Sequence, residues 1–158
     1  MSKPVINPQG TPTSEGQYVT VRIGAQLFGL PINSVHEVFV PQRITPVPLA
    51  SAEIRGALNL RGRIVTMIDM HRLLGLSPGE KHGNMAAGIE FKGESFGLII
   101  DEVGEVLSLD AAKIEPNPVN IDRGWVDILA GVYRMPGELL LVLDVERALA
   151  RISAALVA

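Results

Sequence analysis

Residues 56–74 read GALNLRGRIVTMIDMHRLL, and residues 131–149 read GVYRMPGELLLVLDVERAL. Aligned at a spacing of 75 positions, the two stretches share two glycines, an aspartate, an arginine and a leucine. The positions between these matches keep their apolar or polar character. The coinciding pairs are Gly56 and Gly131, Gly62 and Gly137, Asp69 and Asp144, Arg72 and Arg147, and Leu74 and Leu149.

A second pair of stretches also matches. In each half of the chain, its member comes before the member of the first pair. Residues 28–38 read FGLPINSVHEV, and residues 96–106, which lie 68 positions further on, read FGLIIDEVGEV. Two matched blocks in the same order indicate an internal duplication. Short repeat periods are typical of solenoids, whereas a period of about 70 residues predicts two similar lobes.

Each copy has the pattern of five short strands followed by a helix. Residues 18–23 alternate between apolar and polar side chains and are rich in β-branched residues, which favours a strand. Gly62 and Gly137 end short connections, where a hairpin needs a positive φ. The predicted strands are residues 18–23, 27–30, 37–40, 56–60, 64–68, 88–92, 95–100, 103–107, 131–135 and 139–143. The predicted helical segments are a turn at 31–35, a short helix at 70–76 capped by Asp69, and a helix from Asp144 to about residue 156.

This pattern predicts an all-β fold with short helices, built from two five-stranded β-barrel lobes. The barrels should be closed or nearly closed, because closure removes exposed sheet edges. A lobe of about 70 residues is marginal by itself, so the lobes should pack on each other through an aliphatic core. The expected divisions are a disordered tail at 1–16 and a single domain at 17–158, with lobe one at about 17–80, lobe two and its C-terminal helix at about 84–151, and the boundary loop at 77–84.

Composition excludes several classes of function. The chain has 158 residues and a net charge of −3, so it has no basic excess for binding nucleic acid. It has no cysteine, and its three histidines are too scattered for a metal site, so we predict no cofactor and no metal. No stretch supplies the roughly 20 apolar residues of a membrane span, and the start lacks the apolar run of a signal peptide. We therefore expect a cytoplasmic protein.

Asp69 and Asp144 are the basis of an enzyme hypothesis. Duplicated lobes that each donate one aspartate resemble aspartic proteases, in which two carboxylates share a proton. Neither aspartate begins the D-T/S-G sequence of those enzymes, and both stand between a predicted strand and a predicted helix, where an N-cap belongs. His36 and His71 have no partnered nucleophile in the sequence. A hydrolase that uses the two aspartates and a barrel that binds a small ligand between its lobes remain as alternatives.

Residues present in only one copy are candidates for function, since the repeated fold does not require them. Arg55, Asn59 and Arg61 form such a set at the first hairpin. An arginine on a rigid turn suits bidentate pairing with a partner's carboxylate, although a solvated turn charge explains the same pattern. Glu37 is ambiguous, because Glu105 matches it in the second copy. The counterparts of the three hairpin residues are Ala130, Arg134 and Pro136.

Three stretches resemble the signatures of the CheW-type chemotaxis coupling proteins. Residues 55–70, RGALNLRGRIVTMIDM, resemble the family pattern G-x-x-N-L-R-G-x-I/V-I/V-P-I/V-I/V-D-L/M. Residues 28–38 resemble Y/F-G-I/L-x-I/V-x-x-V-x-E-I/V, and residues 96–109, FGLIIDEVGEVLSL, resemble x-G-I/L-I/V-V-D-x-V-x-x-V-L. The likeness covers about residues 17–151, and Thr66 stands where the family usually has proline.

The resemblance implies a non-enzymatic adaptor made of two five-stranded barrels packed face to face. It implies that the protein couples the cytoplasmic tips of methyl-accepting chemotaxis receptors to the regulatory domain of the histidine kinase CheA. Such a protein would be cytoplasmic and recruited to membrane receptor arrays, with no membrane insertion of its own, no nucleic-acid partner and no cofactor.

The resemblance also implies a set of partner-binding residues, carried over by position. A groove that would receive the receptor helix is expected near Val35, Val38 and the strand at 95–100. The remaining positions, where the contacts of the family with kinase and receptor fall, are Glu37, Ile44, Arg55, Gly56, Asn59, Leu60, Arg61 and Gly62.

Overall fold

The computed structural model describes residues 15–76, 84–116 and 123–157. Over these residues the chain forms ten strands, three α-helices and two 3₁₀ helices. The strands are β1 (Glu15–Ile23), β2 (Gln26–Pro31), β3 (Val35–Phe39), β4 (Ile54–Leu60), β5 (Arg63–Asp69), β6 (Met85–Phe91), β7 (Glu94–Ile100), β8 (Glu102–Asp110), β9 (Leu129–Met135) and β10 (Glu138–Leu143). The helices are η1 (Ile32–Ser34), α1 (Met70–Leu74), η2 (Ala111–Lys113), α2 (Arg123–Val126) and α3 (Val145–Val157).

The predicted elements are confirmed, with small differences at their ends. All ten strands are present, and α1 and α3 begin directly after the two aspartates predicted to cap them. The short helices η2 and α2 were not predicted. β1 begins at Glu15, so the last two residues of the predicted tail belong to a strand, and residues 1–14 of that tail lie outside the described residues.

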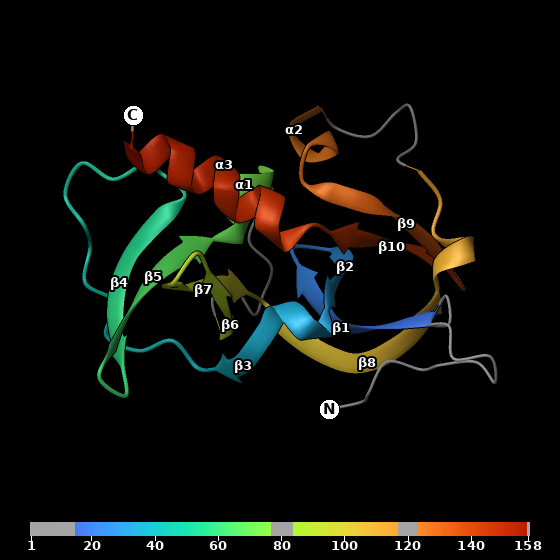
Figure 1. Cartoon of the computed structure of the whole chain (residues 1–158), viewed down its shortest axis with the longest axis horizontal. Helices are drawn as coiled ribbons and strands as arrows, with labels where there is room; N and C mark the ends of the chain where they lie inside the picture. Colours follow the sequence, from blue (N-terminus) through green and yellow to red (C-terminus); the bar gives the residue numbers. More distant parts are fainter. Residues whose placement is uncertain (1–14, 77–83, 117–122, 158) are drawn as a thin grey trace.

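The strands form two five-stranded sheets, which Figure 1 shows side by side. The first sheet has the order β8-β1-β2-β10-β9, and the second sheet has the order β3-β6-β7-β5-β4. Neighbouring strands are antiparallel except for β2 with β10 and β5 with β7, which are parallel. Replacing each strand by its counterpart in the repeat converts one order into the other, so the duplication extends to the sheet topology.

The two sheets do not coincide with the two predicted lobes. The second sheet is formed by the continuous stretch 35–100, whereas the first sheet combines β1 and β2 with β8, β9 and β10. The chain therefore passes between the sheets at η1 and again at Asp101, not at the predicted boundary loop 77–84. Residues 77–83 of that loop lie outside the described residues. Asn33 in η1 and Asp101 are matched positions of the repeat, 68 positions apart.

The expectation of closed barrels is corrected, since neither sheet is closed. After β3, the only bridge to the far edge of the second sheet in the described chain joins Thr45 to Ala57 in β4. The first sheet has the same device, with Glu115 bridging to Val132 in β9. Prolines 41, 46, 48 and 116 flank these bridging residues and have no N–H to extend the pairing.

The core is shared between the sheets, as the predicted aliphatic packing requires. Alternate residues of the central strands point to opposite faces, so Leu141 of β10 packs into a shared cluster while Leu140 and Val142 pack into the cluster of the first sheet. In β5, Ile68 packs into the shared cluster and Met67 into the cluster of the second sheet. The shared cluster also includes Val21, Phe28, Leu30, Leu98, Ile100, Leu73 and Leu149, which come from both sheets, α1 and α3.

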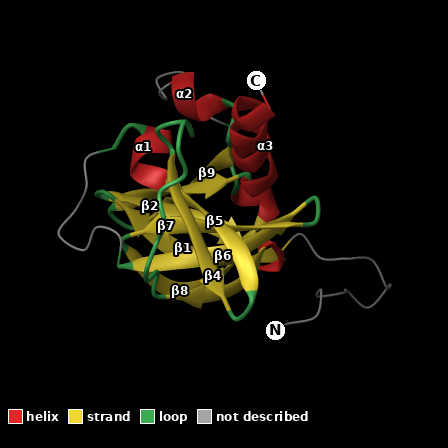
Figure 2. Ribbon diagram, turned by 90° about the vertical axis from the view of Figure 1, so that its left-hand side faces the viewer, coloured by secondary structure: helices red, strands yellow, loops and turns green. Residues whose placement is uncertain are grey.

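The three α-helices lie on one side of the strands (Figure 2). In Figure 1, α3 runs across the top of the molecule from the first sheet toward the second. Trp125 of α2 donates its indole N–H to the Leu74 carbonyl at the end of α1, 2.7 Å away, and its ring contacts Phe28 of β2. No helix in the described part of the chain has the length and apolar character needed to cross a membrane.

We predict that Gly56→Ala destabilises the fold more than Gly62→Ala. A Cβ at Gly56 would lie 2.2 Å from the Thr45 carbonyl oxygen, and Gly56 also has a φ of +148°. Gly62 has a φ of +85° but nothing within 4 Å of its added Cβ. Urea unfolding should show a loss of about 3 kcal/mol for Gly56→Ala and about 1 kcal/mol for Gly62→Ala. Equal losses would contradict the tight bridge.

We also predict that the two sheets unfold in one transition, because most of their buried apolar surface is shared. Trp125 contacts Phe28 in β2 of the first sheet and Leu74 in α1, the helix that follows β5 of the second sheet. Its fluorescence therefore reports on the junction between the sheets. Thermal melts followed by this fluorescence and by far-ultraviolet circular dichroism should coincide. Two separate midpoints would mean that the shared core contributes little.

Candidate partner-binding site

The hairpin between β4 and β5 carries Arg61 at its tip. Arg61 has a φ of +52° and Gly62 a φ of +85°, which is the pattern of a type I′ turn. The side chain of Asn59 supports the turn, since its Oδ1 accepts a hydrogen bond of 2.9 Å from the Gly62 N–H. A positive φ is uncommon for a residue with a side chain, so the turn holds Arg61 in a costly conformation.

The equivalent hairpin between β9 and β10 has the same length but another turn type. Pro136 has its φ fixed near −65° by its ring, and Gly137 has a φ of +83°. This combination suits a type II turn. The glycine is common to both hairpins, while the positive φ at the preceding residue and the guanidinium occur only in the hairpin of Arg61.

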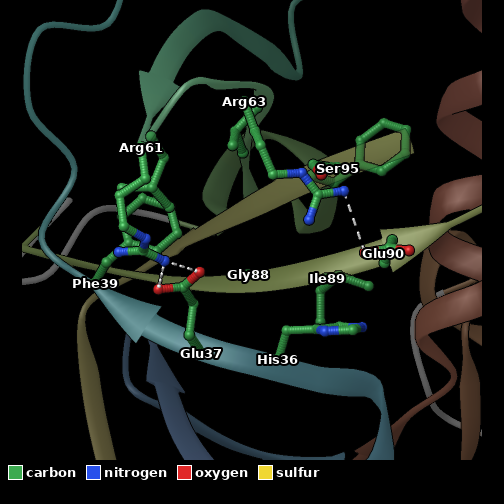
Figure 3. A pocket seen from close by; sticks show the side chains of 12 residues that line it. His36, Glu37, Phe39, Arg61, Arg63, Gly88, Ile89, Glu90 and Ser95 are labelled. Atoms are coloured by element: carbon green, nitrogen blue, oxygen red, sulfur yellow. Dashed lines mark hydrogen bonds and ion pairs between the residues drawn. The ribbon is translucent and has the colours of Figure 1, made fainter. Parts of the chain in front are cut away.

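Arg61 forms an ion pair with Glu37 of β3, as Figure 3 shows. The Arg61 side chain is 67% exposed and that of Glu37 is 36% exposed. A second ion pair joins Arg63 of β5 to Glu90 of β6, with Nη2 and Oε2 3.4 Å apart. The two pairs border a cavity of about 240 Å³ on the second sheet, whose lining also includes His36, Phe39 and Leu60.

The first sheet has an equivalent cavity with the opposite arrangement of charge. There the hairpin supplies the acid and the strand supplies the base: Glu138 of β10 pairs with Arg22 of β1, and the two hydrogen bonds are 2.9 and 3.2 Å long. Glu105 occupies the place of Glu37, but Pro136 stands where Arg61 would be. The repeated fold thus accepts either polarity, and only the second sheet offers an arginine at the hairpin tip.

A second hollow lies along β4 and the segment that follows β3. Its volume is about 540 Å³, and its lining includes Val40, Arg43 and Ile64. Val40 is 58% exposed and Ile64 is 65% exposed, so the hollow presents apolar side chains to solvent. The tip residues Asn59 and Leu60 line it as well. Residues of the β4–β5 hairpin therefore line both hollows.

Arg55 does not join the tip of the hairpin. It lies at the start of β4, about 20 Å from Arg61 at the rise of an extended strand. Its Nη1 is 3.3 Å from Oδ2 of Asp69, so the guanidinium pairs with the capping aspartate. The set of Arg55, Asn59 and Arg61 expected at one hairpin is therefore spread along the whole length of β4.

Gly56 and Ile44 support the bridge between Thr45 and β4. The Ile44 side chain would lie 2.9 Å from a Cβ at Gly56, and it packs against the cluster of the second sheet. In the first sheet, Gly131 holds the equivalent place against Ile114 and the Glu115 carbonyl. The repeat of Ile44 and Ile114, 70 positions apart, is a signal that could have identified these residues as structural.

The residues expected along a receptor groove differ in their exposure. Val38 is 37% exposed, whereas Val35 is half-buried and packs against the shared cluster. The strand expected at 95–100 lies at the centre of the second sheet, and its residues 96–100 are buried. Of that strand, Ser95 and Phe96 line the cavity beside Arg61.

The two aspartates are helix caps, as predicted. Oδ1 of Asp69 accepts hydrogen bonds from the N–H groups of His71 (3.0 Å) and Arg72 (3.4 Å). Oδ1 of Asp144 accepts one from the N–H of Arg147 (3.1 Å). Each carboxylate serves its own helix, and no hydrogen bond joins the two, so the geometry does not favour a catalytic aspartate pair.

The charged groups of the described chain offer no metal site, since no three of its His, Asp and Glu side chains are placed to hold an ion. One arginine has a shifted pKa: the Glu115 carboxylate raises the pKa of the Arg134 guanidinium above its usual value, first through a hydrogen bond of 2.6 Å and then through its charge. Arg134 is the counterpart of Asn59 in the repeat. Its guanidinium pairs with Glu115, the residue that bridges to Val132 in the first sheet.

Three ionisable residues of this cavity were not among the predicted site residues: His36, Arg63 and Glu90. Arg63 belongs to the same NLRGR string as Arg61. The sequence contains a signal that could have identified Arg63 and Glu90, namely a reversal of charge between the two copies. Glu138 stands in the place of Arg63, and Arg22 stands in the place of Glu90. Two coordinated reversals predict an ion pair.

Comparison with known proteins places most of the chain in one family. Residues 17–153 match the family model of the CheW-like domain. The chain is 27% identical over 149 residues to the chemotaxis protein CheW of Treponema pallidum (strain Nichols), which covers 89% of this chain and 85% of that protein. It is 28% identical over 144 residues to the CheW of Klebsiella aerogenes, with 89% and 86% covered.

A solved structure agrees with this match. The scaffolding protein TtCheW from Thermoanaerobacter tengcongensis superposes with a TM-score of 0.75 at 26% sequence identity. The superposition covers 94% of this chain and 89% of that one.

We predict that removing the two caps has unequal effects. Asp144→Ala should lower the free energy of unfolding by about 1 kcal/mol, the usual contribution of an N-cap. Asp69→Ala should cost about 3 kcal/mol, because Asp69 is buried and also pairs with Arg55 and His71. Denaturant unfolding of both variants measures the difference. Asp144→Asn keeps an N-cap and serves as the control, with almost no expected loss.

Proposed function

Because the chain belongs to the family of CheW-like domains, we propose that it is a scaffold that couples chemoreceptors to the histidine kinase CheA. The solved structure that it matches over nearly its full length is that of a scaffolding protein. The partners follow from the resemblance of residues 28–38, 55–70 and 96–109 to the family signatures. In this function the protein catalyses no reaction and acts at receptor arrays on the cytoplasmic side of the membrane.

The fold suits such a role because a coupler must hold two surfaces in a fixed relation. The shared cluster joins both sheets, α1 and α3 into one body. Short hairpins then project from this body with little freedom to move. A displacement imposed at one surface is carried to another surface when the material between them is closely packed.

The observation that carries the proposed binding site is the way in which the hairpin turn presents Arg61. Its guanidinium is exposed, occurs in only one copy of the repeat and is held by a turn in an uncommon conformation. Glu37 orients it from β3, the strand at the opposite edge of the same sheet. A partner carboxylate could share this guanidinium or replace Glu37, while Leu60, which lines the same cavity, offers apolar contact beside it. Val38 is exposed on the other face of β3 and offers a separate apolar contact. This surface is our candidate for contact with the regulatory domain of CheA or the receptor tip.

The remaining residues of the proposed site have supporting positions. Asn59 and Gly62 set the turn that carries Arg61, while Ile44 and Gly56 hold the segment beside β4. Arg55 is half-exposed at the other end of the strand and offers a separate point of contact. Val35, the first residue of β3, packs against the shared cluster and positions the strand.

We predict that Arg61→Glu weakens partner binding and leaves the melting temperature nearly unchanged. The reversal places two carboxylates side by side at the exposed tip and repels a partner carboxylate. Calorimetric titration with the CheA regulatory domain and with a receptor cytoplasmic fragment should show, for at least one of them, a loss of about 30-fold, equivalent to about 2 kcal/mol. Unchanged affinity for both partners contradicts the proposed site.

Two further variants separate the turn from the contact. Arg61→Asn suits the positive φ of the turn and removes the guanidinium, so it should keep the fold and still lose affinity. The double variant Glu37→Arg with Arg61→Glu restores an internal ion pair in reverse. If its affinity returns, the internal pair alone matters. Continued loss of affinity in the double variant supports direct contact with the partner.

A further inference from the structure

Three ionisable side chains are buried at the junction of the two sheets. Asp69 is 3% exposed, His71 is 2% exposed and Asp101 is 4% exposed. Thr20 is the only other polar side chain of the described chain that is buried to this degree. A buried carboxylate is costly unless charged or hydrogen-bonding partners surround it. The cluster therefore needs a reason beyond the packing of the core.

The three groups form a continuous line from the surface of the second sheet to a turn of the first. Nη1 of Arg55 lies 3.3 Å from Oδ2 of Asp69, and Oδ1 of Asp69 lies 3.4 Å from Nδ1 of His71. Nε2 of His71 lies 2.9 Å from Oδ1 of Asp101. Oδ2 of Asp101 accepts a hydrogen bond of 2.8 Å from the N–H of Gly24. We call this series, Arg55–Asp69–His71–Asp101–Gly24, the polar line.

The chain passes between the two sheets at two places, and the polar line lies at one of them. Asp101 is the residue between β7 of the second sheet and β8 of the first. Its own N–H donates to the carbonyl of Arg22 in β1, 2.9 Å away. Gly24 lies in the turn after β1, and His71 lies in α1, which follows β5. Asp101 thus ties a helix of the second sheet to a hairpin of the first.

The repeat shows that the fold does not require this line. Asp69 alone has a matching residue, Asp144. At the second crossing the counterpart of Asp101 is Asn33, which is exposed. No ionic line of this kind could form from the counterparts of Arg55, His71, Asp101 and Gly24, which are Ala130, Glu146, Asn33 and Lys92.

We propose that His71 and Asp101 are positioning residues that couple Arg55 on the second sheet to the β1–β2 turn of the first sheet. This inference rests on the proposed function, in which Arg55 is one of the points of partner contact. A partner carboxylate that engages Arg55 withdraws a cation from Asp69. The charge of Asp69 then acts more strongly on the imidazole of His71, and through it on Asp101 and the Gly24 N–H. Coupling of this kind is reciprocal, so a change at the turn alters the affinity at Arg55.

The first experiment needs no partner and follows the Gly24 amide by NMR. Arg55→Ala should move the Gly24 amide resonance, although Gly24 lies at the far end of the polar line. Arg63→Ala is the matched control, because it removes an exposed ion pair of the same sheet that is not part of the line. In an Asp101→Asn background, Arg55→Ala should no longer move the resonance, and Gly24 should exchange its amide hydrogen about tenfold faster.

Two results overturn the proposal. One is a Gly24 resonance that does not respond to Arg55→Ala, and the other is an equal response with and without the Asp101 carboxylate. His71→Gln provides a second way of interrupting the line if Asp101→Asn does not fold. It should also abolish the response of Gly24 to Arg55→Ala, and a response that survives it counts against the proposal.

The second experiment uses the full receptor–kinase assembly. Asp101→Asn should bind each partner separately with an affinity within about twofold of the original protein, since it touches neither. Receptor control of kinase activity should nonetheless fall about tenfold, an effect that a simple loss of binding would not produce. Asn33→Ala, at the other crossing, should change nothing. Intact control in Asp101→Asn would end the coupling role.

The two experiments fail in different ways. If the unaltered protein binds neither partner, the proposed function is wrong, and the Gly24 measurements still decide whether the polar line transmits a change. If binding is intact and Gly24 does not respond to Arg55→Ala, the proposed function stands and the polar line is only structural.

Discussion

The central strands of both sheets have no polar face, and this constraint governs the whole molecule. In β10 and β5, alternate side chains enter a cluster that belongs to one sheet and a cluster that belongs to both. A strand of this kind must be covered on two sides, which neither sheet can do by itself. The sheets therefore share one core, with α1 and α3 completing it. The rigidity that suits a scaffold is a consequence of this shared burial.

Contacts at the edges of the sheets also hold surface segments in place against the core. At each edge a loop residue makes two backbone hydrogen bonds to the far strand, and a glycine leaves room for its carbonyl. Prolines on the same segments prevent further pairing. The β4–β5 hairpin is consequently supported at its base by the bridge at Thr45 and at its tip by Asn59. Arg61 is thus held at a supported turn, which would lower the entropy lost in the proposed contact with a partner.

The repeat separates what the fold needs from what one copy adds. Caps, hairpin glycines and bridges occur in both copies, and they account for the architecture. Charge does not follow the repeat: the ion pair beside Arg61 is reversed in the first sheet, and the buried line through His71 exists only once. The features unique to one copy lie at the surface proposed to meet partners and at the junction between sheets. These are the two places where the proposed coupling function would reside.

Local sequence alone determined the ten strands, the two capping aspartates and the hairpin glycines, because each depends on neighbours within a few residues. The duplication was determined by comparing the chain with itself at spacings of 68 and 75 positions. The sequence also indicated Arg61, since an unmatched arginine on a turn is visible in one line of sequence, whereas Glu37, which Glu105 matches in the second copy, was indicated only by the family resemblance. Only the tertiary structure decided which strands pair, and it placed β2 beside β10 and β5 beside β7 across the two halves. Arg55 was separated from Arg61 and joined to Asp69 for the same reason. The contact between His71 and Asp101 could not be predicted from the sequence. Their burial, and their approach across 30 positions of the chain, depend on how the sheets meet.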